Sequence, residues 1–369
     1  MPPFSLPSSP HLSDPDARRI AFVAAAADAA GWLTLRQQAL LHRRGWLRML
    51  APKSAGGLEL PLPDVVRLEE AVAAIDGSMA WVLTLCAGAG WFAGFLPPPA
   101  ARAVIGARRL CVAGSGAPTG YADAEGGQFR LNGRWDYASG APMATHFTVN
   151  AVLREGGEVL KDDEGRPRVR AFIVPTAQVR REPSWRTMGL RASASHSYRI
   201  EGALVDASCG FAIDPACATS ADPLYQFPFM ALAWVTLSVN LAGMAAHFLA
   251  LARPAIAARR QSGTGIALIE APGVRARFDA AGSALEAARD RFYTVLDQAW
   301  AEVAAGAPLP AASQASIEQV SLALVEAARL AVDGIYPYCG LVAAGAATPL
   351  NRVWRDFHTA TQHSLLLPA

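Results

Sequence analysis

The chain has 369 residues, of which 52% are apolar and 17% are charged, and its formal net charge is +2. This length is enough for about two or three domains with a large core, and the apolar fraction excludes an intrinsically disordered chain. Because positive and negative charges nearly balance and the basic clusters are short, we expect no nucleic-acid partner.

The first third of the chain is predicted to be helical. Residues 17–51 and 64–83 are rich in alanine and leucine and contain few helix breakers. The next segment, CAGAGWFAG at 86–94, is similar to a glycine-rich dinucleotide loop. It is followed within a few residues by LPPPA instead of a long helix, so we expect its glycines to allow close helix packing.

The five cysteines show no CxxC spacing, and the N-terminal residues lack the basic start and apolar core of a secretory signal. Neither a zinc site nor a disulfide framework is therefore expected, and a cytoplasmic location is predicted.

The middle of the chain is predicted to form β-strands. Glycine and proline become frequent after residue 110, and short runs of alternating polar and apolar residues appear. These runs are QFRLNGRWDY at 128–137, HFTVNAVL at 146–153, VRAFIVP at 169–175 and HSYRIEGALV at 196–205. In the first run, a period of two places Trp135 and Tyr137 on the same face of the strand.

Long helices are predicted again after residue 222, over 232–261, 271–305 and 312–339, followed by a helix from Pro349 to Pro368. Residues 229–252 carry no charge and are long enough to cross a bilayer. Asn240, His247 and the charged turns that follow favour a helix buried in a bundle, and a membrane span is the alternative.

In the last helix, Arg352, Asp356, Thr359 and His363 would share one face, and His358 would point elsewhere. The spacing of the two histidines does not suit a helical metal pair, so no metal site is expected.

Several segments, in this order, resemble the acyl-CoA dehydrogenase superfamily. They are APKSAGG at 51–57, EEAVAAIDGSMAW at 69–81, LNGRWDYASG at 131–140, WRTMGLRASASHS at 185–197, RRQSG at 259–263 and PLNRVWRD at 349–356. The resemblance implies an α+β multidomain fold, with an N-terminal helical domain (1–108), a central β-barrel-like domain (109–222) and a C-terminal four-helix bundle (223–369). It also implies a flavin, FMN or FAD, between the β domain and the bundle, and a homotetramer.

The resemblance assigns candidate flavin contacts. A hydroxyl at the place of Ser139, with Tyr137 beside it, lies against the flavin ring, and a hydroxyl suits a nitrogen whose protonation changes during redox chemistry. The loop with Gly114 and Ser115 lies along the ring edge. Arg259 corresponds to an arginine that reaches a flavin phosphate across a subunit interface, although Ser262 replaces the usual phenylalanine.

The carboxylate that acyl-CoA dehydrogenases use as a base is missing. Its usual place is Ser364, and the helix that carries the alternative glutamate has no acid between 232 and 252. The segment around Gly114 and His363 instead resemble the oxygenase components of two-component flavin-dependent monooxygenases, in which a histidine near this place orients or deprotonates a phenol. Ala89 stands where those enzymes usually carry a second histidine.

The sequence therefore predicts a flavin-dependent oxidoreductase, in which reduced flavin and O2 oxygenate a small, possibly aromatic substrate and a separate reductase supplies the flavin. An acyl-CoA dehydrogenase with a relocated base is the first alternative. A non-catalytic helical or membrane-associated protein is the second.

Overall fold

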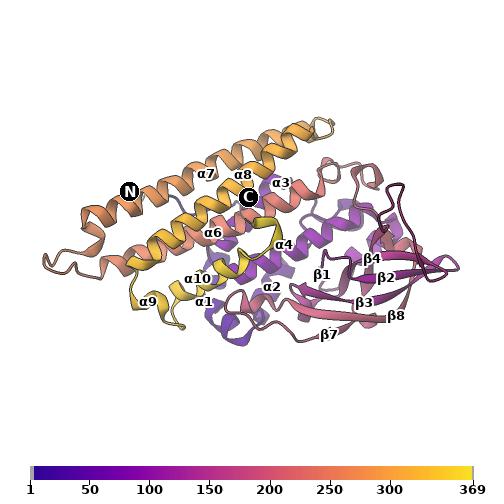
Figure 1. Ribbon diagram of the computed structural model, residues 1–369, viewed down its shortest axis with the longest axis horizontal. Coiled ribbons are helices and arrows are strands. Elements are labelled where there is room, and N and C mark those ends of the chain that lie inside the picture. The colour runs from indigo at the N-terminus through magenta and orange to yellow at the C-terminus, as the bar shows by residue number, and fades with distance from the viewer. Residues whose placement is uncertain (1–3, 368–369) are drawn as a thin grey trace.

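The computed structural model describes residues 4–367, which form, in chain order, a helical N-terminal region, a β-sheet and a helical C-terminal region (Figure 1). The N-terminal region contains α1 (Asp14–Ala30), α2 (Leu35–Arg43), α3 (Leu62–Ala73), α4 (Gly77–Trp91) and α5 (Pro98–Ile105). The C-terminal region contains α6 (Phe229–Ala257), α7 (Pro272–Ala304), α8 (Ala311–Ile335), the short α9 (Leu341–Ala344) and α10 (Pro349–Ala360). This mixed architecture confirms the predicted α+β class.

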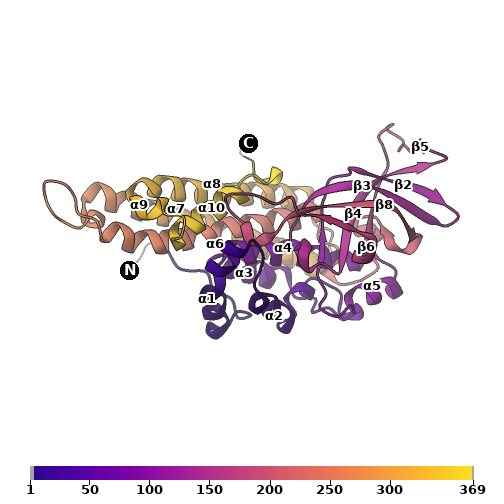
Figure 2. The ribbon, with the colours of Figure 1, turned by 90° about the horizontal axis from the view of Figure 1, so that it is seen from below.

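The strands form one open sheet, whose order is β7-β8-β3-β2-β4-β6-β9, with β1 and β5 also paired to β4. Their bounds are β1 (Val112–Gly114), β2 (Gly120–Glu125), β3 (Gln128–Ala138), β4 (His146–Glu155), β5 (Glu158–Val159), β6 (Val169–Pro175), β7 (Arg180–Glu182), β8 (His196–Asp206) and β9 (Gly210–Phe211). β1 and β2 run parallel to β4, and the other pairs are antiparallel. The sheet lies at one end of the elongated molecule (Figure 2).

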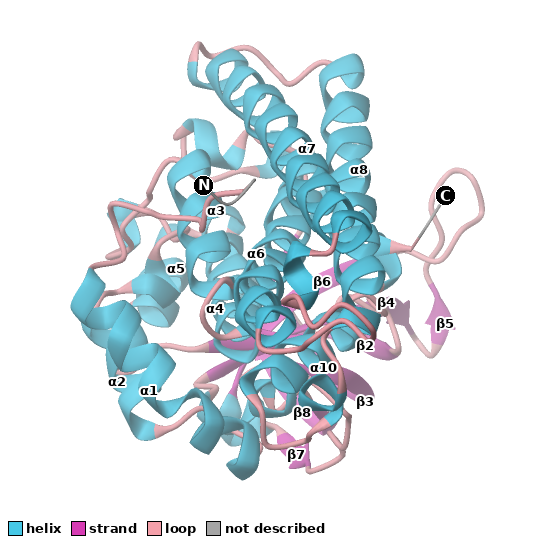
Figure 3. Ribbon diagram, turned by 90° about the vertical axis from the view of Figure 1, so that its left-hand side faces the viewer, coloured by secondary structure: helices cyan, strands magenta, loops and turns pink. Residues whose placement is uncertain are grey.

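The long helices α6, α7 and α8 lie side by side, and α10 packs along α6 (Figures 1 and 3). α6 lies at the centre because it also contacts α3 and α4 of the N-terminal region. The face between α3 and α6 is apolar and closely packed, so one continuous core joins the two helical regions.

Several predicted helices end earlier than the sequence pattern suggested; 232–261 ends at Ala257 and 312–339 at Ile335. Residues 17–51 are split at Gly31, and 64–83 are split at Asp76, whose side chain accepts the Met79 backbone N–H as the cap of α4. The predicted helix from Pro349 to Pro368 is wrong beyond Ala360, where a turn leads to a 3-10 segment at Ser364–Leu366. The glycines of 86–94 lie inside α4 and the turn after it. Close packing holds for Gly94, where a Cβ would lie 2.1 Å from Tyr225, and for Gly90, where it would lie 3.2 Å from the Leu47 carbonyl oxygen, but not for Gly88, where a Cβ meets nothing within 4 Å.

Two helices are long and apolar enough to cross a membrane by length and composition, Gly77–Phe95 and Phe229–Ala257. In each, 83% of the most apolar window is buried inside the fold. Core helices pass the same test, and burial of this extent matches the helix enclosed in a bundle that the sequence favoured.

α10 clamps the segment between β7 and β8. The Leu190 backbone N–H donates to Asp356 Oδ1 at 2.5 Å, the Gly189 N–H donates to Thr359 Oγ1 at 3.1 Å, and Arg355 donates to the Met188 carbonyl. Arg355 also binds Asp28 of α1 at 2.8 Å. Both ends of the chain therefore hold this segment in place.

Gly189→Ala should lower the melting temperature by several degrees, because an added Cβ would lie 1.9 Å from the Arg355 carbonyl oxygen and force the segment away from α10. Gly334→Ala in α8 is the matched control: a Cβ there meets nothing within 4 Å, so the helix propensity of alanine should keep or raise the melting temperature. Equal melting temperatures for the Gly189 variant and the wild type would contradict the clamp.

Candidate functional site

A cavity of about 1210 Å³ lies where the sheet meets the helical regions. Its wall comes from α4, α6 and the end of α10, from β1, β3 and β6, and from the segment that α10 clamps. A pocket for one drug-sized ligand is typically about 300–1,000 Å³, so this cavity has room for a ring system together with a second small molecule.

The wall of the cavity is aromatic and uncharged. Among the described residues 4–367, no Asp, Glu, Lys or Arg lines it, and its titratable side chains are Tyr137 and two histidines. Five of the six predicted site residues lie on this wall, and Ser364, the place of the missing carboxylate, lies there too. The aromatic residues of the wall are Trp81, Phe92, Tyr137, Trp185, Phe211, Phe229 and Trp354.

A β-bulge aims the end of β3 at the cavity. The pairing of β3 with β8 shifts between Trp135 and Ala138, and Tyr137 adopts a left-handed φ of 67°. The expectation that Trp135 and Tyr137 share one face is therefore wrong: Trp135 is fully buried, and Tyr137 is 73% exposed and lines the cavity. Bulges commonly redirect side chains next to active sites.

Ser139, directly after the bulge, belongs to a chain of three buried hydroxyls. Its Oγ lies 2.9 Å from Ser195 Oγ, which lies 2.7 Å from Ser193 Oγ. Ser139 and Ser195 both line the cavity. The sequence analysis did not single out Ser195, although the pairing of Ala138 with His196 places it beside Ser139.

The loop after β1 forms another side of the cavity through Gly114 and Ser115. A side chain at position 114 is excluded, because a Cβ would lie 1.8 Å from Thr148 Oγ1. The loop is fixed by Asn150, which donates to the Gly116 carbonyl at 2.8 Å. Backbone amides can therefore approach a ligand closely here, as the edge of a planar heterocycle requires.

Both C-terminal histidines line the cavity, His358 from the last turn of α10 and His363 from the segment after the turn that follows Ala360. The expectation that His358 points away from the site of His363 is thus wrong. His363 lies edge-on to Trp81, with ring centroids 6.0 Å apart, and burial lowers its pKa. Its Nδ1 accepts the Leu365 backbone N–H at 3.3 Å, which leaves the proton of the neutral ring on Nε2.

His358 is the second histidine of the wall, and its Nε2 lies 3.2 Å from Asp333 Oδ1 of α8. Burial lowers the pKa of His358, and Asp333 opposes this shift. Ala89 also lines the cavity, so the wall is apolar at the place where the resemblance suggested a histidine.

Arg259 is the one predicted site residue that does not line the cavity. It follows the end of α6, where its guanidinium donates to the Tyr338 carbonyl at 2.6 Å and lies against Gly340. A place outside the cavity of its own chain is compatible with the expected contact to a flavin phosphate in a neighbouring subunit.

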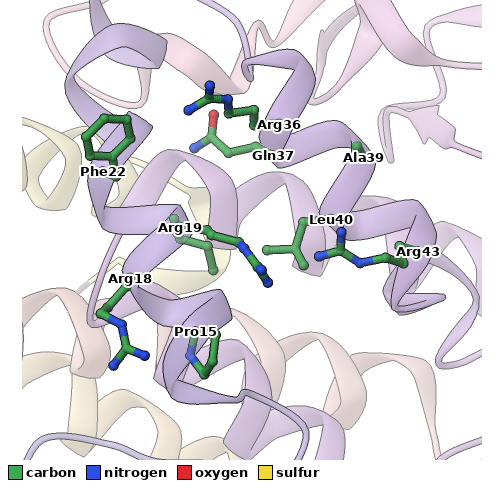
Figure 4. A pocket seen from close by; sticks show the side chains of 10 residues that line it. Pro15, Arg18, Arg19, Phe22, Arg36, Gln37, Ala39, Leu40 and Arg43 are labelled. Atoms are coloured by element: carbon green, nitrogen blue, oxygen red, sulfur yellow. The ribbon is translucent and has the colours of Figure 1, made fainter.

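A second hollow, of about 620 Å³, lies between α1 and α2 (Figure 4). Arg18, Arg19, Arg36 and Arg43 surround it, and the buried Asp16 binds two of them. None of the predicted site residues lines this hollow. No group of three or more His, Cys, Asp or Glu that could hold a metal ion occurs in residues 4–367.

Comparisons with known proteins confirm the resemblance. Residues 235–368 match the family model described as acyl-CoA dehydrogenase, C-terminal domain. The chain is 29% identical over 326 residues to indole-3-acetate monooxygenase from Pseudomonas putida, covering 87% of this chain and 81% of the relative. It is 25% identical over 341 residues to the oxygenase subunit HsaA of a flavin-dependent monooxygenase from Rhodococcus jostii. This match covers 88% of this chain and 85% of the relative.

The structure of XiaF from a Streptomyces species, in complex with FADH2 and glycerol, superposes with a TM-score of 0.84 at 21% identity. The superposition covers 95% of this chain and 89% of XiaF. The chain therefore has the acyl-CoA dehydrogenase-like fold, in the form found in flavin monooxygenases.

The buried carboxyl group of Asp356, which holds the segment between β7 and β8, should make the stability of the protein depend on pH. Burial, followed by the charge of Asp76, raises the pKa of Asp356 to about 8. Because the folded state then binds this proton more tightly than the unfolded state, this contribution to stability is present at low pH and is lost as pH rises toward about 8. Burial lowers the pKa of His247 to about 4. This shift makes stability rise with pH, but only below about pH 6.5, where the histidine of the unfolded state is protonated.

Between pH 6.5 and 8, the melting temperature of the wild type should fall, and that of Asp356→Asn should fall less, since an asparagine still accepts the Leu190 N–H but does not ionise. Melting curves at closely spaced pH values measure both slopes. Asp163→Asn, which changes an exposed loop acid, should keep the wild-type slope. Identical slopes for the Asp356 variant and the wild type would show that Asp356 does not titrate in this window.

Proposed function

We propose that this chain is the oxygenase component of a two-component flavin-dependent monooxygenase, which uses reduced flavin and O2 to oxygenate a small aromatic substrate. One observation carries the proposal: a single cavity is lined by Ser139, Tyr137, Gly114, Ser115 and His363 and contains no carboxylate among the described residues. Removal of an α-proton from an acyl-CoA requires a base in that cavity, and the place of the base is Ser364.

The residues of the cavity fit a flavin ring. The Ser139 hydroxyl, oriented by Ser195, is suited to a ring nitrogen, and the loop of Gly114 and Ser115 allows close approach of backbone to the ring edge. When bound, reduced flavin supplies two electrons to O2, and one oxygen atom is transferred to the substrate while the other leaves as water. FAD is favoured over FMN, because XiaF binds FADH2.

His363 is proposed to bind and orient the substrate. With Nδ1 accepting from the backbone, its Nε2–H donates to an oxygen of the substrate and holds the ring in place. Among residues 4–367, no Lys or Arg lines the cavity to bind a carboxylate or a phosphate, so we propose an uncharged substrate, such as a phenol or a hydroxyindole without an acidic chain.

A separate reductase supplies the reduced flavin, since the relatives include a protein named as an oxygenase subunit. The protein is proposed to be a cytoplasmic homotetramer without a membrane span. In this tetramer, Arg259 of one subunit reaches the flavin phosphate bound in a neighbouring subunit.

The proposal is tested by mixing reduced FAD and O2 with the protein and a panel of phenols and indoles, and by measuring oxygenated product and hydrogen peroxide. We expect product with at least one uncharged aromatic compound and no reduction of bound flavin by an acyl-CoA. Rapid flavin reduction by an acyl-CoA, without product from O2, would instead establish a dehydrogenase with a relocated base.

Ser139→Ala and Ser195→Ala should each weaken binding of reduced flavin about fivefold, the equivalent of roughly 1 kcal/mol for a lost hydrogen bond. Ser139→Thr keeps the hydroxyl and should bind more tightly than Ser139→Ala. Titration of reduced FAD under anaerobic conditions measures the effect. Wild-type affinity in both alanine variants would remove the serine chain from the flavin site.

His363→Ala should leave flavin affinity unchanged, lower the rate of product formation roughly 10- to 100-fold and raise the share of O2 released as peroxide. As a neutral phenol gives up its proton during the reaction, negative charge develops on its oxygen, and a hydrogen bond to a charged group contributes about 1.5–3 kcal/mol. His363→Asn keeps an N–H donor and should recover part of the rate. Product and peroxide are measured together in single-turnover reactions. An alanine variant with the wild-type ratio of product to peroxide would place His363 outside the reaction.

A further inference from the structure

Glu69 of α3 is an ionisable group that the proposed mechanism does not use. Its exposed fraction is 0%, and neither carboxyl oxygen has a hydrogen-bond partner among the described residues. The adjacent Glu70 is different: its carboxylate binds Arg289 at 2.7 Å and the Tyr293 hydroxyl at 2.5 Å. An unpaired buried carboxyl costs stability, so its retention behind the cavity wall calls for a role.

Thr84 of α4 separates Glu69 from the cavity. Thr84 lines the cavity wall, and its hydroxyl acts on the Glu69 carboxyl, whose pKa it lowers against the larger, raising effect of burial. In this conformation the contact is longer or less well aligned than a formed hydrogen bond. A small side-chain rotation is enough to close such a contact.

Asn240 of α6 fixes the direction of the Thr84 hydroxyl. Its Nδ2 donates to Thr84 Oγ1 at 3.0 Å and to the Thr236 carbonyl at 2.8 Å, so both amide protons are used. Since Thr84 Oγ1 accepts from Asn240, its own proton points to another acceptor, either Glu69 on one side or a molecule in the cavity on the other. The hydroxyl can therefore accept a proton from Glu69 and donate its own into the cavity.

No neighbouring charge is paired with the Glu69 carboxyl group among the described residues. On its own helix, Glu70 is bound to the arginine and tyrosine that α7 presents. α4 carries one titratable group, Cys86. α6 carries the buried His247, whose pKa is lowered to about 4 and which is neutral at pH 7, and the exposed Arg253 near its C-terminal end. Among residues 4–367 no cation is paired with Glu69, and burial raises the pKa of its carboxyl group well above the usual value, which favours the protonated form.

We propose that Glu69 is the proton reserve of the cavity and that it supplies, through the Thr84 hydroxyl, one of the protons consumed during oxygenation. The inference rests on the proposed function. Insertion of one oxygen atom into a C–H bond, with release of the other as water, consumes O2, two electrons and two protons, and the electrons come from the reduced flavin. Glu69 gives its proton to Thr84 Oγ1, Thr84 gives its own proton to the developing oxygen anion, and Glu69 is reprotonated from solvent after product release.

The protonation state of Glu69 is tested without flavin or substrate. An infrared difference spectrum of wild type and Glu69→Gln, at pH 7.5, should show the carbonyl stretch of a protonated carboxylic acid that is present only in the wild type. Glu70→Gln is the matched control on the same helix and should lower the melting temperature without removing this band. Asp356 also contributes a protonated carboxyl group at this pH, but it cancels in the difference. Absence of the band from the difference between wild type and Glu69→Gln would show an ionised Glu69 and overturn the inference.

The relay is tested in single-turnover reactions with reduced FAD, O2 and an accepted aromatic substrate. Glu69→Gln and Thr84→Val should bind flavin as the wild type does, form product roughly 10²-fold more slowly and lose the solvent deuterium isotope effect on that step. Thr84→Ser should restore the rate, and Glu70→Gln should keep it. A purely structural role for Glu69 predicts a changed melting temperature with an unchanged isotope effect and an unchanged ratio of product to peroxide, and this result would overturn the relay.

The two proposals fail in different ways. If the wild type oxygenates no substrate, the proposed function fails, and the infrared band still decides whether Glu69 is held neutral behind the wall. If the wild type oxygenates a substrate and Glu69→Gln does so at the same rate, the inference alone fails.

Discussion

The hydrogen bond from the Leu190 backbone to the buried carboxyl of Asp356 is the contact on which the cavity depends. It fixes the segment between β7 and β8 to α10, while Arg355, the preceding residue, joins the same segment to Asp28 of α1. A single helix thus holds a wall that contains residues from distant parts of the chain. The last turn of that helix supplies His358, and the turn after the helix brings His363 to the same cavity. The cavity exists only while the N-terminal region, the sheet and the bundle are packed together.

The ionisable groups around the cavity share one electrostatic feature. Burial shifts the pKa of each toward its neutral form: upward for Glu69 and Asp356, and downward for His247 and His363. In such a low-dielectric region, hydroxyl and imidazole groups form stronger hydrogen bonds than they do in water. Because the effective dielectric constant is low there, a proton that moves into this region interacts more strongly with nearby charges than it would in water. The neutral wall is therefore suited to chemistry in which charge develops on oxygen.

Sequence periodicity was sufficient to predict the long helices and the main strands, because burial repeats at fixed intervals in both. It did not predict the bulge that turns Tyr137 away from Trp135, since a bulge follows from the register with β8. The tail lacks glycine and proline between Pro349 and Pro368, so no local signal marked the end of α10 at Ala360. Glu69 was not identified as part of the site, because its relation to Thr84 arises only when α3 packs on α4.

This cavity differs from that of a dehydrogenase with the same fold in where its carboxyl groups lie. Ser364 faces the cavity, so a carboxylate at that place would reach the substrate, and here a hydroxyl occupies it. Glu69 lies behind the wall, where the hydroxyl of Thr84, a residue that lines the cavity, acts on its carboxyl group. A carboxylate in direct contact abstracts a proton from carbon, whereas a neutral acid behind a hydroxyl donates a proton to oxygen. The same fold can therefore support either reaction, and the placement of the carboxyl group decides between them.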